Sequence, residues 1–123
     1  MNSVEKKAIG TYVVGSYTLK TDTSNNVNLP MLYLRNDKTF TLKYEHKHIE
    51  GRWEAEDYYE FVLIDFTSKE GMTERGNVRI QFGKNVEIKI GAPYDYYFPN
   101  FEKITFKKID TLNTVLPEER RKN

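Results

Sequence analysis

The chain has two histidines, His46 and His48, and both lie in the segment EHKHIE between Glu45 and Glu50. Residues two apart on a β-strand point to the same side, so a strand that continues through this segment would align both imidazoles with Glu50. Such a group could hold a transition metal or supply a general base. The segment is therefore either a site of chemistry or the polar end of a hairpin.

A tight metal site needs more ligands than this segment offers. Zinc sites in proteins use three or four His, Cys or carboxylate ligands. The chain contains no cysteine and no third histidine, which leaves only carboxylates such as Glu45 or Glu50 to complete the set. We therefore expect no metal and no cofactor, and we interpret His46 and His48 as a polar strand end near the mouth of the fold.

Nucleophilic catalysis has little support in the sequence. No serine lies in a G-x-S-x-G motif, although a triad can also be assembled in space from distant residues. Glu54 and Glu56 alternate with Trp53 and Ala55, so we expect both carboxylates to face solvent. Asp65 lies in the apolar run YYEFVLIDF, where a hydrogen-bonded structural carboxylate is favoured over a functional one. The sequence favours a protein that is not an enzyme.

The most unusual segment by composition is GAPYDYYFPNF, residues 91–101, which places five aromatic rings in a loop that also contains two prolines. Such a loop either folds over one end of the domain as an apolar plug or presents a contact patch of the kind enriched at protein interfaces. We favour the plug. The candidate residues for contact with a partner or ligand are Tyr94, Tyr96, Tyr97, Phe98, His46 and His48.

Period-two alternation dominates the chain, and helical periodicity is nearly missing. In residues 39–47, Phe40, Leu42 and Tyr44 alternate with polar residues, which is typical of a half-buried antiparallel strand. The same pattern predicts strands at 10–20, 31–35, 39–47, 52–56, 58–66, 76–82, 86–90 and 101–109. Short turns join them, so we expect an all-β, antiparallel up-and-down meander of about eight strands that closes into a small barrel. An open sheet or a sandwich is the alternative.

A length of 123 residues fits one domain. We expect a lead-in over residues 1–9, the barrel over 10–110, and a charged tail over 111–123, where Pro117 either begins a short helix or the chain frays. The net charge of +1 gives no reason to expect a nucleic-acid partner. No apolar run approaches the ~18 residues of a membrane span.

The cellular compartment stays open. The first residues, MNSVEKKAIGTYVV, lack the apolar core of a signal peptide. This leaves a cytoplasmic protein, or an exported one whose leader or lipidated cysteine lies outside the sequence. The absence of cysteine excludes disulfides and thiolate catalysis in either case.

Four segments carry a resemblance to a known family: GTYVV, NDKTFTLKY, GRWE and FEKITFKKI. Together they resemble the small lipocalin-like, or calycin-type, β-barrel domains of bacterial proteins without an assigned role. In that pattern a D-x-T-F turn leads into the third strand and G-x-W begins the next; here these are residues 37–40 and 51–53. We expect Asp37 to support a turn, Gly51 to allow a close bend and Trp53 to fill the interior.

The sequence thus indicates a non-catalytic binding protein that acts through one barrel end and its loops. Its partner would be a protein, as for small inhibitor or immunity-type proteins, or a small apolar ligand, and we expect a monomer or a weak dimer. A small hydrolase-like enzyme that uses His46 or His48 as a base beside Glu50 is the alternative from another functional class.

Overall fold

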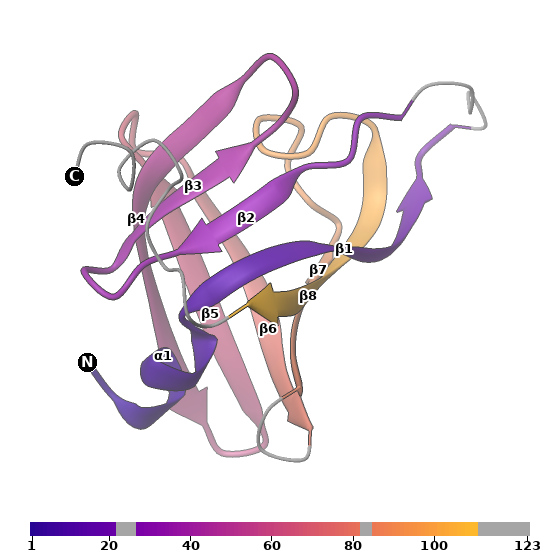
Figure 1. Ribbon diagram of the computed structural model, residues 1–123. Coiled ribbons are helices and arrows are strands. Elements are labelled where there is room, and N and C mark those ends of the chain that lie inside the picture. Colours follow the sequence, from indigo (N-terminus) through magenta and orange to yellow (C-terminus); the bar gives the residue numbers. More distant parts are fainter. Residues whose placement is uncertain (22–26, 82–84, 111–123) are drawn as a thin grey trace.

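Eight antiparallel strands form a closed barrel in which each strand pairs with the next and the last returns to the first (Figure 1). The computed structural model describes residues 1–21, 27–81 and 85–110. The strands are β1 (Gly10–Leu19), β2 (Met31–Leu34), β3 (Thr39–Lys43), β4 (His48–Tyr58), β5 (Phe61–Ser68), β6 (Thr73–Gln81), β7 (Asn85–Gly91) and β8 (Phe101–Asp110). The predicted eight-stranded antiparallel barrel is confirmed, and the open sheet and the sandwich are excluded.

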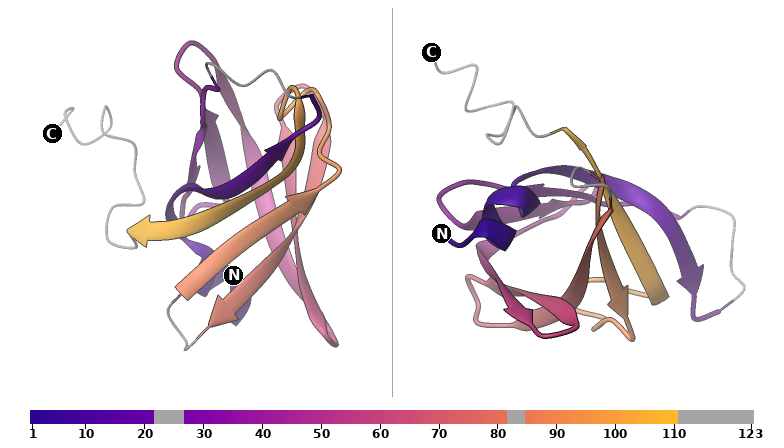
Figure 2. Two further views of the ribbon diagram at one scale, coloured as in Figure 1. Left: turned by 90° about the vertical axis from the view of Figure 1, so that its right-hand side faces the viewer. Right: turned by 90° about the horizontal axis from the view of Figure 1, so that it is seen from below.

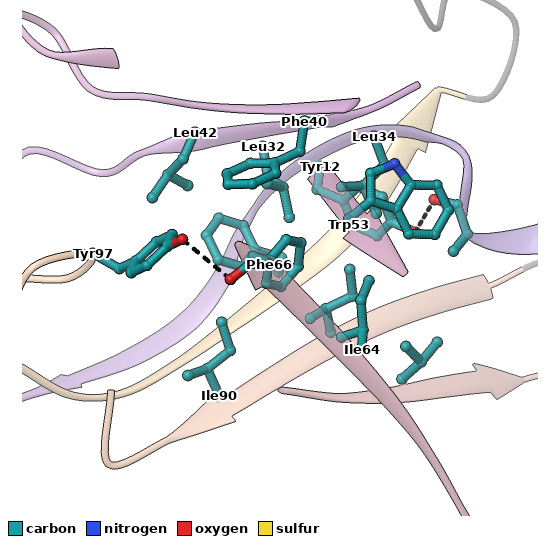
Figure 3. Packing of buried hydrophobic residues seen from close by; sticks show 14 of the residues in the cluster. Tyr12, Leu32, Leu34, Phe40, Leu42, Trp53, Ile64, Phe66, Ile90 and Tyr97 are labelled. Carbon is teal, nitrogen blue, oxygen red and sulfur yellow. Dashed lines mark hydrogen bonds between the residues drawn. The ribbon is translucent and has the colours of Figure 1, made fainter. Parts of the chain in front are cut away.

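The interior is filled by the side chains that alternation assigned to the inward face (Figure 3). Phe40, Leu42 and Trp53 are each 1% exposed, and the rings of Phe40 and Phe66 meet edge to face with their centroids 5.3 Å apart. On the opposite wall Val78, Val86, Ile88 and Ile90 are buried as predicted, and Ile80 is partly buried. Phe82 and the charged tail over residues 111–123, for which a short helix at Pro117 and a frayed end were the alternatives, lie outside the described residues.

Asp37 and Trp53 have the structural roles expected of them, whereas Gly51 lies within β4 and not at a bend at the start of the strand. The Asp37 carboxylate accepts hydrogen bonds from the Thr39 backbone N–H at 3.0 Å and from the Thr39 hydroxyl at 2.6 Å, which fixes the β2–β3 turn. A Cβ at Gly51 would overlap the carbonyl oxygen of Thr67 on β5, so only glycine fits there. The Trp53 indole N–H donates to the Arg35 carbonyl oxygen at 3.2 Å.

The predicted strand 39–47 is wrong at its far end. β3 ends at Lys43, and the Tyr44 N–H donates to the Lys47 carbonyl oxygen at 2.8 Å across a tight turn. His48 begins β4 opposite Lys43. The alternation of apolar and polar residues continued through this turn, and alternation alone does not mark where a chain reverses.

The predicted boundary between strands 52–56 and 58–66 is also wrong. β4 and β5 form one long hairpin whose closing pair is Tyr58 and Phe61, with the turn at Tyr59 and Glu60 rather than at Asp57. Tyr59 adopts φ 51°, a left-handed conformation that turns usually assign to glycine or asparagine. Neither Tyr59 nor Glu60 is a residue type typical of turns, so the predicted boundary at Asp57 is two residues too early.

A short helix, α1 (Ser3–Ala8), lies in the segment expected to form the lead-in over residues 1–9. Asn2 caps it: the Asn2 side chain accepts from the Glu5 N–H and the Glu5 carboxylate accepts from the Asn2 N–H, which is a capping box. Val4 and Ala8 enter the core, and the helix packs on β4. Two turns of helix are too short to produce a detectable periodicity, whereas the capping box was present in the sequence.

The two ends of the barrel are closed by different segments. α1 lies at the lower end in Figure 1, and the loop between β7 and β8 lies at the upper end; Figure 2 shows the lower end from below. The Tyr12 hydroxyl donates to the Ala8 carbonyl oxygen at 2.7 Å and joins the helix to β1. Among the described residues, no helix has the length and apolar character needed to cross a bilayer.

Candidate functional site

The aromatic loop between β7 and β8 turns two of its rings into the barrel. Tyr97 and Phe98 are each 2% exposed and belong to the core cluster. The Tyr97 ring stacks with Phe40 at a centroid distance of 6.3 Å, and its hydroxyl lies 3.1 Å from the Phe66 carbonyl oxygen and 2.7 Å from that of Met72 (Figure 3). Burial raises the pKa of the Tyr97 phenol to about 12. These two rings therefore plug the upper end from within.

A buried carboxylate anchors the base of this loop. Glu74 on β6 is 4% exposed, and it accepts from the Tyr94 N–H at 2.8 Å and from the Arg75 N–H at 3.2 Å. Burial raises the pKa of Glu74, and the two backbone N–H groups oppose that rise only in part. The sequence analysis did not single out Glu74, which occupies an inward position in a strand that was predicted to begin three residues later.

Further contacts fix the rest of the loop. The Tyr44 hydroxyl donates to the Tyr97 carbonyl oxygen at 2.6 Å, and burial raises the pKa of Tyr44. The Tyr96 hydroxyl donates to the Glu70 carboxylate at 2.5 Å; this bond raises the pKa of Tyr96 and lowers that of Glu70. Tyr94 is 60% exposed, so among the four candidate rings it presents the most surface to a partner.

The two histidines lie at the surface of the protein. His46 lies in the β3–β4 turn with its side chain 84% exposed, and His48 is exposed at the start of β4. The Nε2 atom of His46 lies 3.7 Å from a carboxylate oxygen of Glu45. Neither imidazole lines the grooves described below. In the described part of the chain no group of three or more His, Asp or Glu residues is placed to hold a metal ion.

Asp65 and the paired glutamates lie on the outer face of the sheet. The Asp65 carboxylate receives two hydrogen bonds from the Arg75 guanidinium, at 2.7 and 3.0 Å. It is therefore the structural carboxylate that we expected, although it faces outward. Phe61 and Leu63 lie on the same face of β5 as Asp65. Leu63 is half-buried and Phe61 is 57% exposed. Glu54 and Glu56 are exposed as predicted.

A groove of mixed apolar and polar lining runs along the rim of the upper end. One depression of about 440 Å³ is lined by the apolar or aromatic residues Val27, Leu29, Met31 and Tyr44 and by the polar residues Asn28, Lys43 and Glu45. A second depression of about 310 Å³ shares Val27 and Tyr44 and extends the groove to Phe101. We call the two together the rim groove.

Sequence reasoning missed the rim groove. Its signal was the apolar pattern of VNLPML just before β2, where Leu29 is 45% exposed. A run of this kind is expected to be buried inside a strand, and only the fold places part of it at the surface.

The upper end thus combines a plugged barrel mouth, a rim groove of mixed apolar and polar lining, and an exposed tyrosine on the loop that forms the plug. Glu74 and Tyr96 are engaged in holding the loop. Comparison of the chain with family models, with curated proteins and with solved structures finds no match.

Proposed function

We propose that this chain is a non-catalytic binding protein that binds a partner protein at the upper end of its barrel. The observation that carries the proposal is the rim groove, where Leu29 is 45% exposed beside Val27 and Met31. Apolar surface that stays in water costs free energy, and a partner that covers it recovers about 25 cal/mol for each Å² buried. A groove of this kind accepts apolar side chains from a partner.

The plug favours a protein partner over a ligand held inside the barrel. Tyr97 and Phe98 occupy the space beneath the mouth, so the available apolar surface lies outside the barrel and around its rim. Tyr94 adds an exposed ring on the same loop, and tyrosine is enriched at protein interfaces. An inhibitor or immunity-type role would use this contact.

A small apolar ligand is the second candidate. The two depressions of the rim groove, of about 440 and 310 Å³, fall in the range of small-molecule sites, and apolar side chains contribute much of their lining. Such a ligand would lie against Tyr44 and Phe101 at the surface.

We also propose that the chain is related to the lipocalin-like, or calycin-type, barrels. The support is the eight-stranded up-and-down topology together with the D-x-T-F turn at residues 37–40 and the G-x-W segment at residues 51–53. In this chain those motif residues serve the fold: Asp37 fixes a turn, and Trp53 fills the interior. The relation therefore bears on ancestry and architecture, and the binding proposal stands on the rim groove alone.

Affinity capture with matched surface variants tests the binding proposal. Tagged wild-type protein should recover a specific partner from the native host, and Leu29→Arg should abolish the recovery because a charged side chain blocks the rim groove. Ile109→Arg is the matched control, since Ile109 is 55% exposed on β8 and does not line the groove. The captured partner should also cross-link to a photoreactive residue placed at position 94.

Equal recovery by wild type and Leu29→Arg would remove the groove from the binding site. The ligand candidate has its own measurement, the fluorescence of 1-anilinonaphthalene-8-sulfonate, an anionic dye that fluoresces strongly when its aromatic rings bind an apolar surface. Saturable dye binding that Leu29→Arg removes, combined with no groove-dependent partner, would favour the small ligand over the protein.

A further inference from the structure

A second unusual surface lies at the lower end of the barrel, at the tip of the β4–β5 hairpin (Figure 1). Tyr58, Tyr59 and Phe61 are 42%, 105% and 57% exposed, so three rings stand in solvent within four residues. Tyr58 and Phe61 are directly paired across the hairpin, which places their rings side by side on the outer face of the sheet. We call residues 54–61 the hairpin tip.

The backbone conformation of the hairpin tip gives no reason for aromatic residues at this place. Tyr59 holds φ 51°, where glycine or asparagine fits without strain and a bulky side chain is disfavoured. Its ring makes no contribution to the core, because the residue is fully exposed. A tyrosine at this position therefore costs stability and gives no packing in return, which points to a use outside the fold.

The charged residues of the hairpin tip itself are all acidic, while Arg75 and Lys38 lie beside it. Glu54, Glu56, Asp57 and Glu60 form no ion pair with any side chain in residues 1–21, 27–81 or 85–110. The adjacent carboxylates are already neutralised, Glu5 by Lys38 at 2.9 Å and Asp65 by Arg75 at 2.7 Å. The chain as a whole carries a net charge of +1, so the hairpin tip concentrates negative charge that the rest of the molecule does not share.

A depression of about 200 Å³ lies between the tip and α1. Its lining includes Glu54, Glu56, Tyr58 and Leu63, together with Asp65 and the ion pair of Glu5 and Lys38. The Tyr58 hydroxyl donates to the Glu56 carboxylate at 2.8 Å and orients that carboxylate beside the ring. A long side chain with a cationic head could lay its alkyl part on Leu63 and Tyr58 while its charge meets the two glutamates.

We propose that the hairpin tip docks an arginine- or lysine-containing segment of a partner protein. Carboxylates pair with the cationic heads, and exposed tyrosine and phenylalanine faces attract the same cations. Charge complementarity and the exposed aromatic rings therefore both favour a partner segment with cationic side chains. This surface lies at the opposite end from the rim groove, so it would let the barrel contact a partner at each end.

A titration with defined peptides tests the proposal. The probes are a short synthetic peptide rich in arginine and leucine and the same peptide with every arginine replaced by glutamine, each added to the isotopically labelled full chain. We expect the arginine peptide to bind roughly tenfold or more tightly than its glutamine counterpart, to shift backbone amide signals in residues 54–61, and to weaken as salt is raised.

Three variants separate binding from folding. Tyr59→Gly removes a ring and relieves the left-handed strain, so it should fold at least as stably as the wild type and yet bind the arginine peptide more weakly. Glu54→Gln combined with Glu56→Gln should weaken binding and flatten its salt dependence. Tyr94→Ala, which removes an exposed ring at the other end of the barrel, should leave the affinity unchanged.

Other results would overturn the proposal. Equal affinity for the two peptides would exclude recognition of cationic side chains, and unchanged binding by all hairpin variants would place the contact elsewhere. Self-association of the chain that depends on Tyr59 would identify a second copy as the occupant in place of a basic partner. The Leu29→Arg experiment probes the opposite end of the barrel. If one of the two binding proposals fails, the test of the other is therefore unaffected.

Discussion

The buried Glu74 carboxylate accepts a hydrogen bond of 2.8 Å from the backbone N–H of Tyr94, and this contact fixes the base of the loop that plugs the barrel. No ion pair within the described residues neutralises Glu74. A carboxylate that is buried with hydrogen bonds but without a counterion lowers the stability of the folded state, because it loses hydration. The plug therefore depends on a group whose charge state follows pH.

The first prediction concerns Glu74 and pH. Its pKa is raised in the folded protein, so the folded state holds the proton more tightly than the unfolded state. The Glu74 contribution to stability is then fully present below the ordinary glutamate pKa and is lost as pH rises through the raised value. In Glu74→Gln this dependence is absent. The difference in unfolding free energy between variant and wild type should move in favour of the variant as pH rises, by about 1.4 kcal/mol for each unit of elevation.

Urea unfolding of both proteins between acidic and neutral pH measures this difference. Glu70→Gln is the matched control, because the Tyr96 hydroxyl lowers the pKa of Glu70 and the sign is reversed. Removal of Glu70 should become less favourable as pH rises. A Glu74→Gln difference that stays flat with pH would show that Glu74 titrates normally in the folded protein.

The second prediction concerns the Tyr97 hydroxyl. Tyr97→Phe keeps the ring stacked near Phe40 and removes a donor that lies within hydrogen-bond distance of two backbone carbonyl oxygens. We expect a loss of about 1 to 2 kcal/mol in unfolding free energy. Tyr94→Phe, at an exposed ring on the same loop, should change it by less than about 0.5 kcal/mol. Equal values for the two variants would show that the Tyr97 hydroxyl does not anchor the plug.

The third prediction concerns Gly51. Alanine at this position would place its Cβ against the Thr67 carbonyl oxygen and force β4 and β5 apart. Backbone cannot yield as a flexible side chain does, so we expect a loss of about 3 kcal/mol or more in unfolding free energy. Thermal unfolding followed by circular dichroism measures the effect. Gly71→Ala tests a different cause, since no atom lies near its Cβ and only its φ of 89° opposes the substitution.

The fourth prediction concerns the cap of α1. Asn2→Ala removes the helix cap and the bond from the Asn2 side-chain amide to the Ala55 carbonyl oxygen, which is 2.8 Å long. The expected cost is about 1 to 2 kcal/mol. Ser3→Ala, at an exposed first-turn position, should be close to neutral. Slowed hydrogen exchange at the Glu5 amide in wild type, lost in Asn2→Ala, would verify that the cap is the cause; equal stability of the two variants would argue that α1 does not contribute to the fold.

Strand number and strand face were predictable because both follow from local alternation. Phe40 and Leu42 on β3 and Ile88 and Ile90 on β7 occupy the interior as period two requires. Asp37 and Trp53 likewise have the roles that their residue types suggested. Turn positions were less predictable: Tyr59 and Glu60 form a turn that no local preference favours, and the alternation of residues 39–47 ran past the true end of β3.

The amino-acid sequence by itself determined an all-β meander and the inward face of its strands, because side chains two apart on a strand share a face whatever the rest of the chain does. Only the tertiary structure decided which residues of the aromatic loop are buried. Tyr97 and Phe98 enter the core while Tyr94 stays exposed, since Phe40, Phe66 and Met72 from distant strands supply the contacts. The rim groove and the hairpin tip arise in the same way, where the closed barrel leaves side chains such as Leu29, Tyr59 and Phe61 exposed.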